Sequence, residues 1–297
     1  MKKYIIGVDI GGSNIKAGLV LKGSIIKRYS VKTESEKGKK VVIENIIKAI
    51  MGVFTSNVLG IGVGSPGPSD YKKGIIIGPE NVPLKNVNLK KILEKKFNVP
   101  VFLDNDANCF VLGEAVYGSG KKSDVVIGLT LGTGVGGGIV VNKKIFHGHL
   151  NAGELGHMSI KHDGVKCNCG NVGCIEEYAS TRGIMRTAKG LKAKTPLEVY
   201  NLALKGNKKA LNVFDKTGFY LGVTITNLIA VFDPEVIIIG GEISKSFKFF
   251  SKSMKDTIKE RSFVNKNPKI VKSKLKGAAI LGAASLVKKW TLTTLQS

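Results

Sequence analysis

Two stretches of the chain repeat one pattern of glycine and apolar residues, 121 positions apart. They are YIIGVDIGGSNIKAGLV at Tyr4–Val20 and VVIGLTLGTGVGGGIVV at Val125–Val141, and four positions are identical in register. Each copy is a run rich in β-branched residues, a glycine-rich turn and a second apolar run, which is typical of two strands joined by a tight hairpin. The sequence therefore predicts the same strand-turn-strand unit twice.

The turn of each copy has the composition of a phosphate site. Glycines leave backbone N–H groups open to close approach, and such groups bind phosphate oxygens. Only the first copy carries a carboxylate, Asp9, whereas the second has Thr130 and Thr133. The pair predicts a nucleotide held between two related halves, with a divalent metal on the acidic side. Four identities are equally compatible with two unrelated α/β strands that both end in glycines.

Strand and helix patterns alternate along the rest of the chain. Since typical domains have about 100–200 residues, 297 residues predict two domains. We expect a small α/β domain at 1–118, joined by the C-terminal helix at 278–297, and a large α/β domain at 119–277, with a hinge at 118–120. Further expected strands are 24–31, 58–63, 101–103 and 236–239, and expected helices are 40–54, 89–97, 107–117, 207–231 and 277–290.

The net charge of +24 raises the question of a nucleic-acid partner or an anionic surface. The lysines are scattered, however, with no basic arm and no interleaved aromatic residues, so we interpret them as a solvated surface. The longest uncharged run, Val125–Val141, is rich in glycine and lacks helix formers, which favours paired strands over a membrane helix. Asp9 interrupts the only run that resembles a signal peptide. We expect a cytoplasmic protein with no membrane partner.

A cluster of thiols and one imidazole is the sharpest local signal. Cys167, Cys169 and Cys174 have the spacing C-x-C and C-x4-C, and His157 lies ten positions upstream. Three thiolates and one imidazole are the ligands of a closed tetrahedral zinc site, so we predict structural Zn²⁺. The alternatives are a disulfide, which is rare in cytosolic proteins, or reduced core cysteines. Cys109 lies outside the cluster and is interpreted as a buried thiol.

Two carboxylates adjoin this cluster. Glu154 precedes His157, and Glu176 follows Cys174. A metal that fixes the histidine would also orient these acceptors for a ligand rich in hydroxyl groups, such as a sugar. The alternative is that both glutamates are only solvated.

Eight motifs spread over nearly the full length carry a resemblance to a known family. They are DIGG at 9–12, GSPGP at 64–68, NVP at 81–83, NDAN at 105–108, LGTGVGGG at 131–138, GELGH at 153–157, CNCGNVGCIEEYAS at 167–180 and IIIGGEIS at 237–244. The chain resembles sugar kinases of the ROK family (repressors, open reading frames, kinases), within the actin/hexokinase ATPase superfamily. The resemblance implies an α/β, two-domain actin-like ATPase (ribonuclease H-like) fold with an inter-domain cleft and a zinc-binding loop.

The resemblance also implies roles for single residues. Asp106 corresponds to the catalytic base that takes a proton from a sugar hydroxyl, commonly the 6-hydroxyl, as it attacks the γ-phosphate of ATP. From its place alone, at the start of a helix, Asp106 is equally an N-cap. His157 would contact zinc through one ring nitrogen and the sugar through the other. The full set of implied sugar contacts is Gly64, Pro66, Asn81, Asn105, Asp106, Glu154, His157 and Glu176.

The implied nucleotide contacts come from three turns. Gly11 and Gly12 resemble the first phosphate loop of the family, Thr133 and Gly134 the second, and Gly240 and Gly241 the adenosine-side glycines. Asp9 is expected near Mg²⁺, through water, because magnesium prefers oxygen ligands and keeps several waters. Glu242 stands where many relatives have a third glycine, which leaves the adenosine contacts open.

The leading functional expectation is an ATP-dependent hexokinase, a glucokinase that converts glucose to glucose 6-phosphate. The alternatives are an N-acetylmannosamine or N-acetylglucosamine kinase, a fructokinase, and a sugar-sensing regulatory protein. Repressors of the family have a helix-turn-helix before the DIGG strand, and only eight residues precede Asp9 here. We therefore expect sugar and ATP as partners, no nucleic acid, and a homodimer or homotetramer.

Overall fold

The computed structural model describes residues 2–79, 81–264 and 266–294, with the backbone alone for 288–294. The chain divides into two compact units, and each is considered by itself below. The first comprises 1–122, 139–152 and 274–297, and the second comprises 123–138 and 153–273. The division places 139–152 in the first unit, whereas the sequence led us to expect this segment in the large domain. The expected boundaries stay predictions, and their last residues, 295–297, lie outside the described residues.

The first unit is built on a five-stranded sheet with the order β3-β2-β1-β4-β8. Its strands are β1 (Tyr4–Ile10), β2 (Asn14–Leu21), β3 (Ser24–Lys32), β4 (Val58–Ser65) and β8 (Val101–Asn105). β1 and β2 pair antiparallel, which confirms the first predicted hairpin. β1, β4 and β8 run parallel, so their carboxyl ends meet at one edge.

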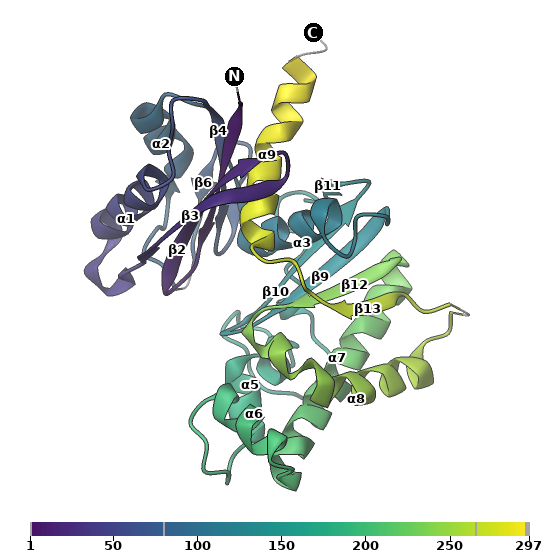
Figure 1. Cartoon of the computed structure of the whole chain (residues 1–297). Coiled ribbons are helices and arrows are strands. Elements are labelled where there is room, and N and C mark those ends of the chain that lie inside the picture. Colours follow the sequence, from purple (N-terminus) through teal and green to yellow (C-terminus); the bar gives the residue numbers. More distant parts are fainter. Residues whose placement is uncertain (1, 80, 265, 295–297) are drawn as a thin grey trace. The chain divides into compact units, whose positions relative to one another are not determined.

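Helices cover both faces of this sheet (Figure 1). Buried residues of α1 (Lys39–Met51) and α2 (Leu89–Phe97) share one apolar core with the strands, and Phe54 packs on Phe97 at 5.1 Å beside it. A second core joins the sheet to α9 (Ala278–Thr294), which lies against α3 (Asp106–Tyr117). A small sheet in this unit contains β5 (Ser69–Asp70), β6 (Ile75–Ile76) and β7 (Val87–Asn88), and η1 spans Ser35–Lys37.

Close packing of α9 depends on glycines at the contact. A Cβ at Gly62 would lie 1.7 Å from the carbonyl oxygen of Ala283, and one at Gly282 would lie 1.7 Å from that of Cys109. No side chain fits there, so the backbones of α9, β4 and α3 touch directly.

The second sheet repeats the strand order of the first. Its order is β11-β10-β9-β12-β13, formed by β9 (Val125–Leu131), β10 (Val135–Val141), β11 (Lys144–Ile145), β12 (Val236–Gly240) and β13 (Lys269–Lys272). The division between the units falls within β10. In both sheets a strand-turn-strand unit is followed by a parallel strand, β4 beside β1 and β12 beside β9. The predicted duplication is therefore confirmed.

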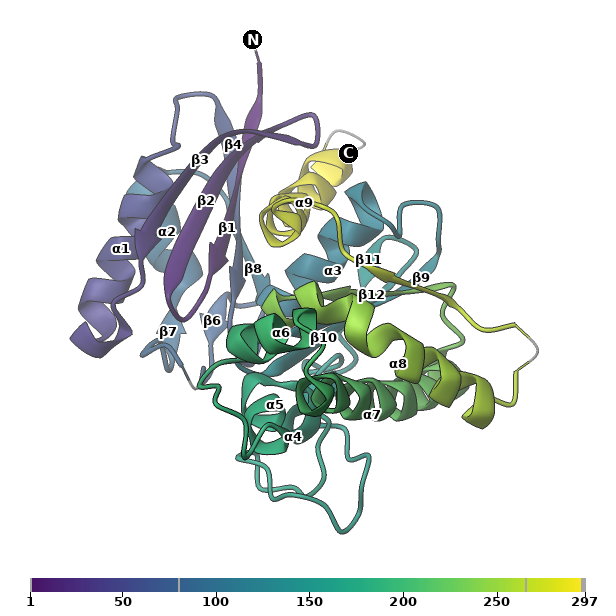
Figure 2. The same cartoon turned by 60° about the horizontal axis from the view of Figure 1, so that its bottom comes forward.

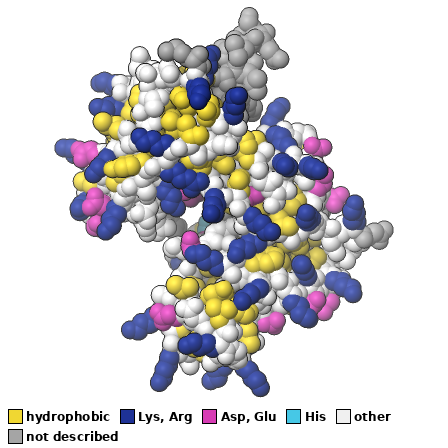
Figure 3. Space-filling model, in the orientation of Figure 1, with side chains coloured by type: hydrophobic (Ala, Val, Ile, Leu, Met, Phe, Trp, Pro, Cys, Tyr) yellow, Lys and Arg dark blue, Asp and Glu magenta, His cyan; other side chains and the backbone are white. Residues whose placement is uncertain are grey.

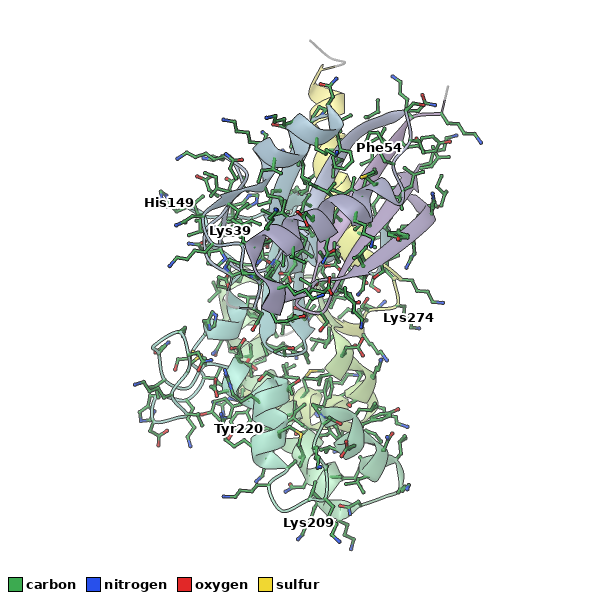
Figure 4. The ribbon with its side chains drawn as sticks, turned by 90° about the vertical axis from the view of Figure 1, so that its left-hand side faces the viewer. Lys39, Phe54, His149, Lys209, Tyr220 and Lys274 are labelled. Carbon is green, nitrogen blue, oxygen red and sulfur yellow. The ribbon has the colours of Figure 1, made fainter. Side chains whose placement is uncertain are left out.

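The helices of the second unit come after β10 in the chain, as the colours of Figure 2 show. They are α4 (Glu176–Ala179), α5 (Thr181–Thr187), α6 (Pro196–Leu204), α7 (Lys208–Phe232) and α8 (Phe247–Arg261), with the short turns η2 (Leu155–His157) and η3 (Glu242–Ser246). Tyr220, labelled on α7 in Figure 4, packs against Tyr178 of α4 at 4.3 Å between ring centroids. This contact fixes the segment that follows the cysteine cluster.

The expected helices and strands agree with the observed ones to within a few residues. The helix expected at 89–97 coincides with α2, whereas the strand expected at 101–103 continues to Asn105 and the helix after it begins at Asp106. Within the described residues, no helix combines the length and apolar character needed to cross a membrane. Lys and Arg side chains are scattered over the face drawn in Figure 3 and do not gather in one patch there.

Candidate functional site

In the first unit the candidate residues lie at the carboxyl ends of three parallel strands. Asp9 of β1 is in register with Gly64 of β4, and Gly64 is in register with Asp104 of β8. Strand pairing thus places the DIGG, GSPGP and NDAN motifs side by side, although they are far apart in the sequence. Ligands of α/β proteins gather at such strand ends.

The turn from β8 into α3 presents Asn105 and Asp106. The side-chain oxygen of Asn105 accepts hydrogen bonds from the N–H groups of Ala107 and Asn108, at 2.8 and 3.2 Å, so Asn105 is the N-cap of α3. Its amide donates to the carbonyl of Gly67 at 3.3 Å, which ties the GSPGP loop to this turn. Asp106 is the first residue of the helix, and its Oδ1 accepts from the N–H of Ala107 at 2.8 Å. Its carboxylate thus lies at the positive end of the dipole of α3.

Negative charge concentrates at this end of the sheet. Burial raises the pKa of the Cys109 thiol well above its usual range, and the carboxylates of Asp104, Asp106 and Asp9 raise it further. Burial also raises the pKa of Asp9, against the positive charge of Lys16. A cation beside Asp9 would offset the cost of ionising a buried carboxylate, and carboxylate oxygen is the donor that Mg²⁺ prefers.

The turn between β1 and β2, which was expected to bind phosphate, adjoins the Asn81 loop. A Cβ at Gly12 would lie 3.8 Å from the Cβ of Asn81. The carbonyl of Gly11 accepts a hydrogen bond from the Thr33 hydroxyl at 2.6 Å, and its N–H donates to Asn14 at 3.0 Å. The turn is therefore held by its own unit. Pro66 lies in the loop between Gly64 and Gly67, next to the Asn105 contact.

In the second unit the turn between β9 and β10, which was expected to bind phosphate, is held by residues that follow the cysteine cluster. The N–H of Val135 donates to Oε2 of Glu176 at 2.9 Å, and Arg182 donates to Oε1 of the same carboxylate at 3.3 Å. Thr181 donates from both its N–H and its hydroxyl to the carbonyl of Gly132, at 2.8 and 3.0 Å. Glu176 thus contacts the turn that contains Thr133 and Gly134, a link that the sequence did not indicate.

His157 is the last residue of the short turn η2, and Glu154 directly precedes that turn. The N–H of His157 donates to the carbonyl of Glu154 at 3.1 Å. Partial desolvation raises the pKa of Glu154, His157 lowers it, and Glu176 raises it. These electrostatic effects indicate that the three side chains form one polar group. A Cβ at Gly156 would lie 1.8 Å from the carbonyl oxygen of Val135, so η2 rests directly on β10.

The four residues predicted to bind zinc form one cluster. Their ligand atoms all lie within 4.8 Å of one another. Cys167 Sγ is 3.8 Å from Nδ1 of His157, and Cys169 Sγ is 3.7 Å from Cys174 Sγ. Ligands of a tetrahedral zinc ion with Zn–S bonds of about 2.3 Å are roughly 3.8 Å apart, so the spacing fits zinc. It is too long for a disulfide, and all four cysteines are free thiols, with Cys109 buried as predicted.

The thiol environment also fits a divalent cation. Burial raises the pKa of Cys174 to about 12, and the neighbouring thiols contribute to this shift. Adjacent thiolates therefore need a positive charge between them, which a zinc ion supplies. Cys167 Sγ also lies within 4.8 Å of carboxylate oxygens of Glu176 and Glu177, so the cluster adjoins the polar group of η2. The imidazole turns Nδ1 toward the thiols, which leaves Nε2 for another partner.

A small pocket of about 190 Å³ adjoins the Gly240–Gly241 turn. Gly241 has a φ of +82°, and a Cβ there would lie 2.2 Å from the carbonyl oxygen of Leu131, so only glycine fits. The pocket is lined by apolar and polar residues of α5, α6 and η3, namely Thr181, Thr195, Pro196, Leu197, Tyr200, Glu242, Ile243, Lys245 and Ser246. Thr181 lines this pocket and also donates to the carbonyl of Gly132, so one residue links the pocket to the turn between β9 and β10.

Sequence reasoning missed several residues of these sites. Asp104 adjoins the NDAN motif but was not singled out, and its carboxylate lies 2.7 Å from Nε2 of His147. Tyr71 stacks on that imidazole. Neither His147 nor Tyr71 has a local signal, because their neighbour Asp104 is 43 and 33 positions away in the chain. Tyr200 likewise has no local signal in the sequence, where it looks like any aromatic residue of an amphipathic helix.

The chain is similar to known proteins along nearly its full length. The model of the ROK family matches residues 5–290. The glucokinase of Thermotoga maritima is 36% identical over 310 residues, which cover 97% of this chain and 98% of that protein. The xylose repressor of Bacillus subtilis is 32% identical over 96% of this chain and 77% of its own length. The structure of a ROK family glucokinase from Streptomyces griseus, in complex with glucose and AMPPNP, has a TM-score of 0.84, 30% identity, and coverage of 96% of this chain and 99% of that one. The fold is therefore that of actin-like ATPases, and this chain belongs to the ROK family.

Proposed function

We propose that this chain is an ATP-dependent sugar kinase that phosphorylates the 6-hydroxyl of glucose, with Asp106 as the general base. The observation that carries the proposal is the convergence of Asp9, Gly64 and the Asn105–Asp106 turn at the carboxyl ends of three neighbouring strands. In a chain related to glucokinases along its length, this edge supplies a carboxylate for the hydroxyl and another for a metal.

Asp106 would accept the hydroxyl proton as the sugar oxygen attacks the γ-phosphorus and the bond to the β-phosphate oxygen breaks. Asp106 is the first residue of α3, so its carboxylate lies at the positive end of the helix dipole. Asn105 is fixed by three hydrogen bonds, to Ala107, Asn108 and Gly67, so its side chain is oriented before a sugar arrives. Gly64, Pro66 and Asn81 would complete this side of the sugar site.

On the second unit, Glu154, His157 and Glu176 would accept and donate hydrogen bonds to the remaining sugar hydroxyls. The zinc ion would hold the loop that contains the three cysteines, and it would not itself contact the sugar. Because Nδ1 of His157 faces the thiols, Nε2 is the atom that would bind the sugar. Glu176 would connect the sugar to the phosphate turn, because its carboxylate already binds the N–H of Val135.

For the nucleotide, the pocket beside Gly240 and Gly241 would take the adenosine, and the Thr133–Gly134 turn would bind phosphate. Thr181 supports this assignment because it lines the pocket and holds the turn. Gly11 and Gly12 would bind phosphate from the first unit. Asp9 would hold Mg²⁺ through water; the ion, when bound, neutralises charge on the transferred phosphate.

A coupled assay of ADP release tests the proposal. Purified protein with Mg²⁺ and ATP is offered glucose, mannose, fructose, allose, N-acetylglucosamine and N-acetylmannosamine. We expect glucose to have the highest kcat/KM. A preference for an N-acetylhexosamine or for fructose would replace the substrate and keep the reaction, and no ADP release with any sugar would contradict the proposed activity. Size-exclusion chromatography with light scattering tests the proposed homodimer or homotetramer.

A sugar-sensing regulator is the second candidate, because a xylose repressor matches 96% of this chain. A regulator would bind sugar without turnover, and binding to DNA would show a sequence preference that persists as salt rises. A shift that is lost between about 50 and 200 mM salt on any sequence would instead reflect the scattered lysines alone.

A further inference from the structure

One polar contact in the first unit joins two residues that are not among the expected sugar or nucleotide contacts. Nε2 of His147 lies 2.7 Å from Oδ2 of Asp104, and both side chains are largely enclosed, with 19% and 5% of their surfaces exposed. His147 follows β11 in the segment 139–152, which the fold assigns to the first unit although the chain on both sides of it belongs to the second. The contact is therefore an anchor of this segment on the strand end that carries Asp106.

Asp104 connects His147 to the β8–α3 turn, where Asp106 lies. Its other oxygen, Oδ1, accepts hydrogen bonds from the N–H of Asn105 at 2.8 Å and from the side-chain amide of Asn108 at 2.9 Å. These two donors flank Asp106 on either side in the chain. One buried carboxylate thus joins His147 to the turn that sets the direction of Asp106.

The imidazole itself is held in a fixed plane. Tyr71 stacks on it with 3.7 Å between ring centroids and 12° between planes. Both rings line a cavity of about 450 Å³ whose other walls are mainly apolar, including Phe102, Leu112 and Leu286. In such surroundings a hydrogen bond to a carboxylate is stronger than in water, and its loss costs more.

We propose that His147 is a positioning residue for phosphoryl transfer: by holding Asp104, it fixes the β8–α3 turn in the geometry that presents Asp106 to the sugar. The inference rests on the proposed function, since it takes Asp106 as the base. His147 is not one of the proposed substrate contacts, and it acts through Asp104.

The first test compares His147→Ala with His149→Ala. His149 lies two positions along the same segment and is exposed, as labelled in Figure 4. We expect His147→Ala to lower kcat by about 10- to 100-fold, because a misplacement of about 1 Å costs up to about 100-fold, while the KM for ATP stays within about twofold. His149→Ala should keep the wild-type kcat. A wild-type kcat in His147→Ala overturns the inference.

The second test separates positioning from loss of stability. Removing the imidazole leaves a space between Tyr71 and Asp104 that opens to the cavity, so free imidazole can enter it. We expect imidazole to raise the kcat of His147→Ala in a saturable manner and to leave wild type and His149→Ala unchanged. A loss of kcat that follows a lowered Tm and is not restored by imidazole overturns the inference.

If His147→Ala does not fold, the kcat of His147→Gln is compared with that of His147→Asn instead. Only Gln places an amide nitrogen where Nε2 lies, so kcat should be higher in Gln than in Asn, and equal values contradict the inference. Asp106→Asn is measured alongside. If it retains wild-type turnover, the proposed base is wrong; if it is inactive while His147→Ala is normal, only the positioning role is wrong.

Discussion

Substitution of Gly156 by alanine probes the polar group that we assign to the sugar. Gly156 lies between Glu154 and His157 on η2, and a Cβ there would be 1.8 Å from the carbonyl oxygen of Val135 and 2.9 Å from its carbon. Both atoms belong to the backbone of β10 and cannot rotate away. η2 or the start of β10 must therefore move.

The size of the effect follows from this distance. A carbon–oxygen contact needs more than 3 Å, so the two backbones must separate by more than about 1 Å. Such overpacking costs about 1–3 kcal/mol of stability. The same movement carries Glu154 and His157 away from Glu176, which is fixed on Val135. A displacement of about 1 Å corresponds to a loss of about 100-fold in kcat/KM for the sugar, or about 2.7 kcal/mol of transition-state stabilisation.

The assay is steady-state ADP release with varied sugar, together with thermal unfolding. Gly78→Ala is the matched control, because a Cβ at Gly78 would meet no atom within 4 Å and its φ is not positive. We expect the control to keep the wild-type kcat/KM and Tm. A normal sugar kcat/KM in Gly156→Ala would refute the assignment of η2 to the sugar site.

Three further predictions concern the metal and nucleotide sites. Cys167→Ser should release zinc, which metal analysis measures, and should raise the KM for sugar about tenfold because His157 is no longer held in place. The zinc affinity of the wild-type protein should rise with pH, because the metal displaces thiol protons. Purified wild-type protein without zinc would contradict the site. Burial raises the pKa of Asp9 in the folded protein above its ordinary value of 3.8. The protonated carboxyl therefore stabilises the fold at pH below 3.8, and this stabilisation is lost as pH rises through the raised pKa. Asp9→Asn should raise the Tm at pH 7, with a gain that vanishes in acid, and it should lower turnover. Tyr200→Ala should raise the KM for ATP about three- to tenfold and leave the KM for sugar unchanged, as an apolar contact to the base is removed; an unchanged KM for ATP would place the adenosine elsewhere.

The duplicated scaffold could be predicted from the sequence because its signal is local. In each copy a β-branched run, a glycine turn and a second run fix the hairpin, and the observed strand orders β3-β2-β1-β4-β8 and β11-β10-β9-β12-β13 extend the repeat beyond the hairpins. The cysteine cluster was equally local, since spacing alone brings three thiols onto one loop. The helix boundaries were predicted to within a few residues, as for α3, which was expected from 107 and begins at Asp106.

Contacts between distant segments could not be predicted in this way. Glu176 was expected to face a sugar, yet its carboxylate also binds Val135 on the phosphate turn, 41 positions away. The Asp104–His147 contact depends on β11 and on the division of the chain at 139–152, neither of which has a sequence pattern of its own. Such links arise from packing between distant segments within each unit, so they appear only with the structure.

The central claim is that Asp106 takes the proton from the sugar hydroxyl, and the most direct test is Asp106→Asn. Turnover is measured by ADP release, and glucose binding by calorimetry. A general base contributes about 10²- to 10⁴-fold, so we expect kcat to fall at least about 100-fold while the Kd for glucose changes less than about threefold. A variant that turns over like wild type would contradict the account.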